Sequence, residues 1–87
     1  MKNEITLKIH SREGTLFDGK VSSLSAINKT GKFDIMAMHA NFISLIQDKV
    51  TYRDALTLQV HDIPIQQAIL RATGNLVDIY LGLTRSN

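Results

Sequence analysis

The sequence contains no cysteine, one proline and five glycines. The absence of cysteine excludes disulfide bonds, thiolate metal sites and a thiol nucleophile. The glycines are isolated from one another, so none belongs to a glycine-rich phosphate loop or to the Gly-x-Ser-x-Gly elbow of a hydrolase. The histidines, at 10, 39 and 61, have no spacing typical of metal ligands. We therefore expect no catalytic site, no metal and no cofactor.

Long hydrophobic runs and blocks of like charge are also missing. No apolar run approaches the roughly 18–20 residues of a membrane span, and residues 1–7 lack the apolar core of a signal peptide. Any membrane association is therefore expected to go through a partner. The net charge is +2, and its basic residues are spread along the chain, whereas nucleic-acid-binding surfaces usually cluster them. We expect no nucleic acid as a partner, and the lack of cysteine suits a reducing cytosol.

Alternation of apolar and polar residues is the clearest structural signal in the chain. Residues 5–10 and 56–61 alternate with a period of two, which is typical of half-buried strands. Turn-forming residues separate the apolar segments at Ser11–Gly14, Asp18-Gly19, Asn28–Gly31, Arg53-Asp54 and Gly74-Asn75. This spacing predicts one all-β domain over residues 1–87, a small antiparallel β-sandwich or flattened barrel of about 8–10 short strands.

Some segments allow more than one interpretation. Residues 37–47 contain Ala, Met and Leu, so a helix competes with a strand there. The segment 76–83 has apolar residues on both sides, which indicates a strand covered on both faces. Pro64 cannot donate a ladder hydrogen bond, so it is expected at a sheet edge or a strand end. The residues expected in the core here are Phe33, Ile35, Ile43 and Leu45.

One run of the sequence resembles a known family. Residues 31–46 read Gly-Lys-Phe-Asp-Ile-Met-Ala-Met-His-Ala-Asn-Phe-Ile-Ser-Leu-Ile. This is similar, without gaps, to Gly-Glu-Phe-Gly-Ile-Leu-Pro-Gly-His-Ala-Pro-Leu-Ile-Thr-x-Leu, a pattern of the N-terminal β-sandwich of F-type ATP synthase epsilon subunits. The segments 17–21, 5–14 and 69–79 resemble other strands of that domain in the same order, so the similarity covers nearly the whole chain.

The resemblance implies a non-catalytic central-stalk subunit that couples the gamma subunit to the c-ring in proton-driven ATP synthesis. It implies a cytoplasmic location, peripheral at the inner or plasma membrane through the ATP synthase complex. Carried over by position, the partner surface consists of Gly31, Lys32, Met36, Met38, His39, Ala40 and Phe42. The first two fall at the ring-facing tip, and the two methionines flank the histidine with adaptable apolar side chains.

The sequence departs from the family pattern in several places. Lys32 replaces an acidic residue, and Ala37-Met38 and Asn41 replace a Pro-Gly pair and a proline. Because the chain ends at Asn87, we expect it to lack the family's C-terminal helical hairpin and any regulation through it. Two alternatives stay open: a small β-barrel nucleic-acid-binding module and a homo-oligomeric β-sandwich interaction domain. Basic residues around an aromatic groove would favour the nucleic-acid-binding module. An apolar patch near His39 would favour the stalk subunit. We also expect that the isolated chain can self-associate.

Overall fold

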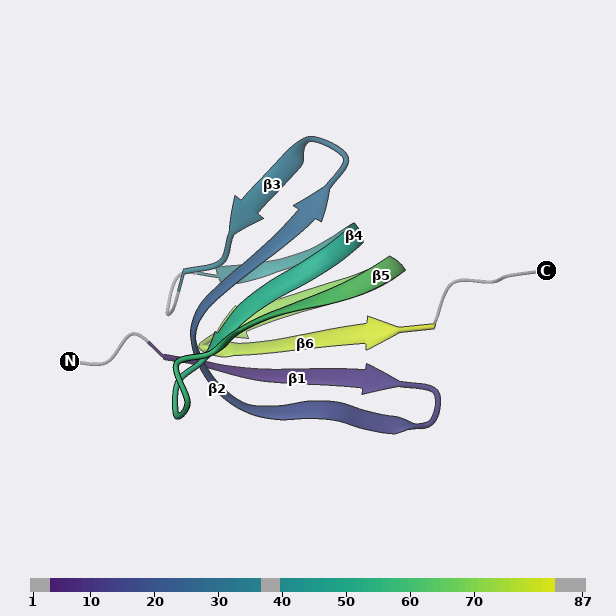
Figure 1. The fold of residues 1–87 in the computed structure, drawn as a ribbon. Coiled ribbons are helices and arrows are strands. Elements are labelled where there is room, and N and C mark those ends of the chain that lie inside the picture. Colours follow the sequence, from purple (N-terminus) through teal and green to yellow (C-terminus); the bar gives the residue numbers. More distant parts are fainter. Residues whose placement is uncertain (1–3, 37–39, 83–87) are drawn as a thin grey trace.

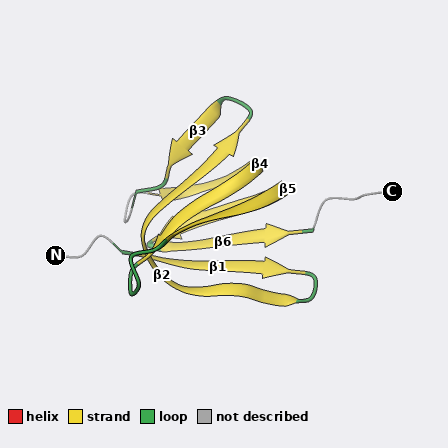
Figure 2. Cartoon of the chain, in the orientation of Figure 1, coloured by secondary structure: helices red, strands yellow, loops and turns green. Residues whose placement is uncertain are grey.

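The computed structural model describes residues 4–36 and 40–82, and all regular structure in these ranges is β-strand (Figures 1 and 2). The six strands are β1 (Ile5–Ser11), β2 (Gly14–Asn28), β3 (Gly31–Asp34), β4 (Ala40–Asp54), β5 (Val60–Gly74) and β6 (Leu76–Leu81). The all-β fold class is confirmed. The strands are fewer and longer than expected because β2, β4 and β5 each contain 15 residues. A helix over 40–47 is wrong, and 37–39 lie outside the described residues.

The strands form a closed ring. Their order is β1-β6-β5-β4-β2-β3, and an additional pairing of β1 with β2 closes the sheet on itself. All pairs are antiparallel except β1 with β6, which run parallel with Thr6 opposite Leu76. β3 lies outside the ring, and among the described strands it pairs with β2 alone. Closure pairs β1 along both of its edges, which helps a small chain to satisfy its backbone hydrogen bonds.

The ribbon of β4 and β5 doubles back on itself. A straight strand of 15 residues would be about 50 Å long, and Figure 1 shows both strands turning over instead, so that their halves lie in opposite layers. The turnover coincides with a bulge between Gln47 and Asp48, where Asp48 has a φ of 70°. Gln66 is the unpaired residue of β5 at this bulge. It switches the inward positions of β5 from odd to even numbers, so Ile65 and Ala68 both face the core.

β2 changes layers in the same way. Its first half pairs with β1 and its second half with β4 and β3, with a bulge between Val21 and Ser23. The turn expected at Asp18-Gly19 is wrong, because both residues pair with β1 inside the strand. A Cβ at Gly19 would lie 3.2 Å from Phe17 Cζ. The glycine therefore makes room for the Phe17 ring, which packs on Tyr52 with centroids 4.6 Å apart.

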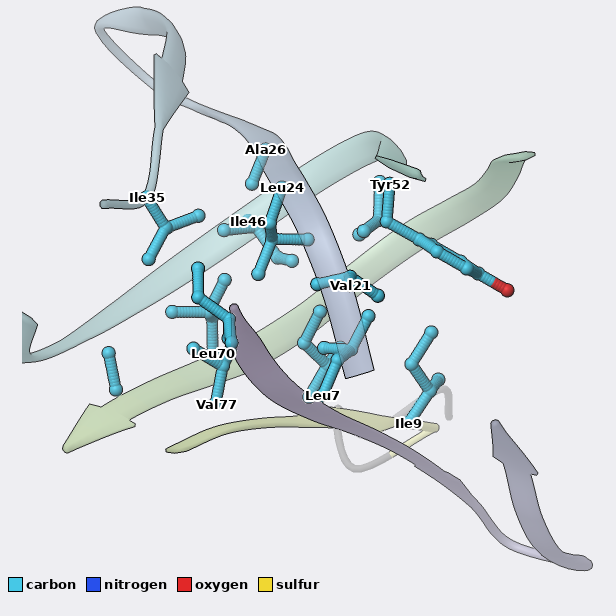
Figure 3. Packing of buried hydrophobic residues seen from close by; sticks show 14 of the residues in the cluster. Leu7, Ile9, Val21, Leu24, Ala26, Ile35, Ile46, Tyr52, Leu70 and Val77 are labelled. Atoms are coloured by element: carbon cyan, nitrogen blue, oxygen red, sulfur yellow. The ribbon is translucent and has the colours of Figure 1, made fainter. Parts of the chain in front are cut away.

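The core fills the space between the two layers (Figure 3). Its largest fully buried side chains are Leu7, Ile9, Leu24, Ile46, Leu70, Ile79, Val21, Val50 and Val77. Ile35 is buried and Phe33 packs against this cluster, so two of the four expected core residues in this part of the chain are confirmed. The alternation of Ile5, Leu7 and Ile9 predicted β1 correctly.

The strand expected over 56–61 is wrong for its first four residues. Residues 55–59 connect β4 to β5, and Leu56 is 91% exposed. Asp54 shapes this connection: its carboxylate accepts a hydrogen bond from Leu56 N at 2.8 Å, and its carbonyl accepts one from Leu58 N at 2.8 Å. Local capping by Asp54 thus overrides the alternating pattern. Pro64 fits its expectation, because the part of β5 that contains it pairs only with β4 among the described strands.

Substitutions at Asp48 test whether its backbone conformation is needed for the β4–β5 ribbon to fold over. Its positive φ disfavours a β-branched side chain by about 1–2 kcal/mol, so Asp48→Val should lower the free energy of unfolding by that amount, while Asp48→Gly should not lower it. Urea denaturation measures both. Lys49→Val, at the exposed neighbour, serves as the control and should stay within about 0.5 kcal/mol of the parent. Equal losses in all three variants would contradict a specific role for the Asp48 backbone.

Ionisation of Tyr52 makes the free energy of unfolding depend on pH in the alkaline range. Burial raises the pKa of its hydroxyl, and the nearby Asp54 carboxylate raises the pKa further. The unfolded chain, with an ordinary tyrosine pKa near 10, therefore loses this proton first. The free energy of unfolding should fall as pH rises above about 10. Comparing thermal unfolding at pH 8 and above pH 10 checks this, and Tyr52→Phe should remove part of the fall.

Candidate partner-binding surface

The described residues of the expected partner surface lie along β3 and at the start of β4. Gly31, with a φ of 125°, begins β3 after the turn at 29–30, and Lys32 follows with an exposed side chain. Met36 lies beyond the other end of β3 and is 65% exposed. A groove of about 460 Å³ contains both Lys32 and Met36 in its lining, together with serines of β2. Residues near both ends of β3 therefore line the same open groove.

The other expected residues surround the entry to β4. Met38 and His39 lie outside the described residues. Ala40 is the first residue of β4 and pairs with Gly74. Phe42 is 37% exposed and meets the Phe33 ring edge to face at a centroid distance of 6.2 Å. The Phe42 ring thus packs on Phe33 while part of the residue stays exposed, and the assignment of these residues to a partner surface stays a prediction.

A larger apolar surface lies on the outer side of the layer formed by β4, β5, β6 and β1. The strand register places Leu45, Ile69, Tyr80 and His10 in one row across these four strands. Ile43 lies in the next row, and Leu76 lies one row further in the same direction. Ile43 is 70% exposed, Leu45 58% and Leu76 40%. We call the set Ile43, Leu45, Ile69, Leu76 and Tyr80 the β4–β6 face.

A row of charged residues crosses the β4–β6 face between the row of Tyr80 and the row of Leu76. Arg71, Asp78 and Lys8 lie opposite one another in the row next to Tyr80. Asp78 Oδ1 is 2.9 Å from His10 Nε2, and the His10 ring stacks on Tyr80 at 4.8 Å. The stack and the hydrogen bond fix the orientation of Tyr80 at the border of the face. A rigid aromatic ring that is half exposed is a favourable contact for a partner.

The outer side of the opposite layer is polar. Ser25 Oγ donates a hydrogen bond to Asp34 Oδ1 and Thr51 Oγ1 donates one to Asp62 Oδ1, both at 2.6 Å. Lys32 lies on the same side of this layer as these residues. A surface of paired hydroxyls and carboxylates has little to gain from losing water. The two outer sides of the sandwich therefore differ, and the apolar one is the stronger candidate for a partner.

Sequence reasoning missed the β4–β6 face because it assigned Ile43 and Leu45 to the core. That assignment is wrong, since both side chains point outward on β4 while Ile46 is buried. The signal was present in the adjacent apolar pairs of residues 42–46. It was also present in β6, where Val77 and Ile79 are buried while Leu76 is exposed and Tyr80 is half buried. Apolar residues on both sides of a strand indicate a second covered face, which a partner can supply.

Residues 4–36 and 40–82 lack two other features. These ranges contain no group of three or more His, Cys, Asp or Glu side chains that could hold a metal ion. They also contain no helix with the length and apolarity needed to cross a membrane.

Comparison with known proteins identifies the family. The family model for the "ATP synthase, Delta/Epsilon chain, beta-sandwich domain" matches residues 4–81. The chain belongs to this delta/epsilon family. A relative in the same family is the ATP synthase epsilon chain of Caulobacter vibrioides, which is 38% identical over 52 residues, or 59% of this chain and 60% of that protein. The resemblance to epsilon subunits is therefore confirmed.

Two solved structures share the fold of this chain although their sequence identity to it is low. A chain of the Euglena gracilis mitochondrial ATP synthase, solved as OSCP/F1/c-ring, has a TM-score of 0.80 at 12% identity and matches 93% of this chain and 52% of its own length. A chain of the Tetrahymena thermophila mitochondrial ATP synthase central stalk/c-ring has a TM-score of 0.71 at 13% identity. It matches 92% of this chain and 64% of its own length. The present chain thus spans about half to two thirds of the relatives it matches.

Leu45 and Ile46 test whether the β4–β6 face is needed for folding. Ile46→Ser places a hydroxyl in the core and removes buried apolar volume, so it should lower the free energy of unfolding by about 3 kcal/mol or more. Leu45→Ser, at the exposed neighbour, should change it by less than about 1 kcal/mol. Urea denaturation of both variants makes the comparison. A large loss for Leu45→Ser would show that this side chain stabilises the fold instead of serving a partner.

Proposed function

We propose that this chain is a central-stalk subunit of an F-type ATP synthase that couples the gamma subunit to the c-ring during proton-driven ATP synthesis. The family match over residues 4–81 is the observation that carries this proposal. The Tetrahymena relative was solved in a central stalk/c-ring assembly, which supports the same location for this chain. In this role the chain catalyses no step, transmits torque by contact, and associates with the membrane through the complex.

The β4–β6 face is the surface we assign to gamma. It combines outward aliphatic side chains on β4 and β5 with the ordered Tyr80 ring on β6. Burial of such side chains drives stable association, at roughly 25 cal/mol per Å² before the costs of binding. A subunit that couples gamma to the c-ring needs a stable contact of this kind with gamma. Met36, Met38, His39, Ala40 and Phe42, at and before the entry of β4, remain the partner residues that the family pattern predicts, as a contact separate from this face.

The turn between β2 and β3 is the surface we assign to the c-ring. Lys29 and Lys32 are exposed there, and neither belongs to an ion pair within the described residues. Gly31 provides the backbone conformation of this tip with its φ of 125°. Because Lys32 stands where epsilon subunits carry an acidic residue, the charge of the contact is inverted. The facing c-ring loop should therefore present an acidic residue in this synthase.

The charge distribution favours this role over nucleic-acid binding. Around Tyr80 the row of charged residues alternates in sign, with Lys8, Asp78 and Arg71 opposite one another. A single-strand-binding surface would instead collect cations around its stacking aromatics. The alternating row suits a protein surface, where pairs of opposite charge fix the register of a contact.

Affinity capture tests the proposal. A tagged chain expressed in its own cells should recover gamma and c-ring subunits. Leu45→Lys should reduce recovery of gamma at least about tenfold, because it inserts a charge into an apolar contact. Lys32→Glu should weaken the c-ring contact, and the loss should shrink at high salt because screening weakens exposed charge pairs. Recovery of neither subunit by the parent chain would refute the stalk role.

Matched variants separate binding from folding. Leu56→Lys changes a leucine that is 91% exposed on the β4–β5 connection, away from both proposed contacts. Lys20→Glu reverses an exposed charge in the β1-pairing half of β2. Both should recover gamma and c-ring as well as the parent does. If they lose recovery equally, the effects at Leu45 and Lys32 are not specific to those positions.

A further inference from the structure

The first half of β4 is an open strand edge. Residues 40–47 pair with β5 on one side. On the other side, the ladder between β2 and β4 runs only from Asp54 to Thr51, so no described strand pairs with residues 41–47 there. The backbone groups that point outward along this edge are available to another extended chain.

This edge lacks the usual protection against pairing. The sequence of residues 41–47 is Asn-Phe-Ile-Ser-Leu-Ile-Gln, with no charge and no proline. The other open edges among the described strands carry such protection. β3 has only four residues and carries the exposed charges Lys32 and Asp34. Residues 60–67 of β5 include Asp62 and Pro64, and residues 14–20 of β2 include Asp18 and Lys20. Short length and charge are devices that prevent edge pairing. The contrast selects β4 as the edge on which a further strand would add.

Space for a further strand lies beside this edge. A groove of about 390 Å³ lies between the β2–β3 turn and β4. Its lining includes Asn28 to Thr30 from the turn and Ile43 to Gln47 from β4. Leu45, which is 58% exposed, belongs to this lining. An extended segment in the groove would pair with the edge and cover apolar side chains at the same time.

The chemistry of residues 41–47 is symmetric about Ser44. Amide side chains, Asn41 and Gln47, stand at the two ends, with apolar residues at the four positions between them and Ser44. We propose that the free chain self-associates by antiparallel pairing of this edge with the same edge of a second copy, with Ser44 opposite Ser44. In this register Ile43 lies opposite the second copy's Leu45, and Asn41 lies opposite the second copy's Gln47.

Such a contact is isologous and closes on itself, so it produces a dimer and not a fibre. The two exposed aliphatic residues of each copy meet across the seam and leave water together. The dimer covers part of the β4–β6 face and so competes with any partner that binds there. This inference concerns the isolated chain and does not depend on the proposed stalk role.

Sedimentation equilibrium of the purified chain tests the proposal, because it needs no other subunit. The parent should show a reversible monomer–dimer equilibrium below about 1 mM. Ile43→Lys/Leu45→Lys places like charges opposite each other in the proposed register and should raise the Kd at least about tenfold. Ile43→Asp/Leu45→Lys places opposite charges together in the same register and should restore most of the association. Leu16→Lys and Leu56→Lys, at exposed leucines elsewhere, should dimerise like the parent.

A second readout does not depend on how the variants fold. Hydrogen exchange of the parent chain should show protection of amides in 41–47 that increases with protein concentration, with no such change in β3. A parent that stays monomeric to about 1 mM, a repulsive double variant that still dimerises, or concentration-independent exchange in 41–47 would each overturn the proposal. Failure here leaves the capture of gamma and c-ring untouched, so the two hypotheses are tested separately.

Discussion

The structure depends on the folding over of the β4–β5 ribbon at the bulge beside Asp48. Two strands of 15 residues cannot stay straight in a domain of this size, and the bulge lets one hairpin supply both layers. The hairpin half near the connecting turn joins the polar layer, and the half near Ala40 and Gly74 joins the layer with the apolar outer side. The core is the space enclosed by this turnover, so its residues come from all parts of both strands.

The same turnover gives the two outer sides their different character. Beyond the bulge, the outward positions of β4 and β5 carry Thr51 and Asp62, which hydrogen-bond to each other. Before it, they carry Ile43, Leu45 and Ile69. One hairpin therefore presents a hydrated surface and an apolar surface on opposite sides of the molecule. The apolar side is the one on which a contact with another protein would remove the most apolar surface from water.

The sequence predicts the parts of this fold that depend on simple alternation. β1 and the all-β class follow from the period-two pattern and the turn residues. The folded-over strands do not follow from simple alternation. A bulge moves the inward positions from odd to even numbers, so one long strand shows two alternating patterns. Such a strand is easily predicted as two strands separated by a turn. Asp18-Gly19 misleads for another reason: this dipeptide is a common turn signal, but here the glycine makes room for the Phe17 ring inside β2. The partner surface was predicted around residues 31–42 from the family pattern, whereas the β4–β6 face required the strand register, which residue types alone do not give.

The parallel pairing of β1 with β6 has a consequence for how the protein is made. Thr6 lies beside Leu76, and His10 beside Tyr80, so β1 finds this neighbour only when β6, about 70 residues later in the chain, is complete. Until then Ile5, Leu7 and Ile9 have no finished core to enter. The ring can close only after residues 76–81 have left the ribosome, and pairing over such a separation is slow. Nascent chains of this protein are therefore expected to expose the hydrophobic side chains of β1 until β6 has been made, and to be bound by chaperones at that segment.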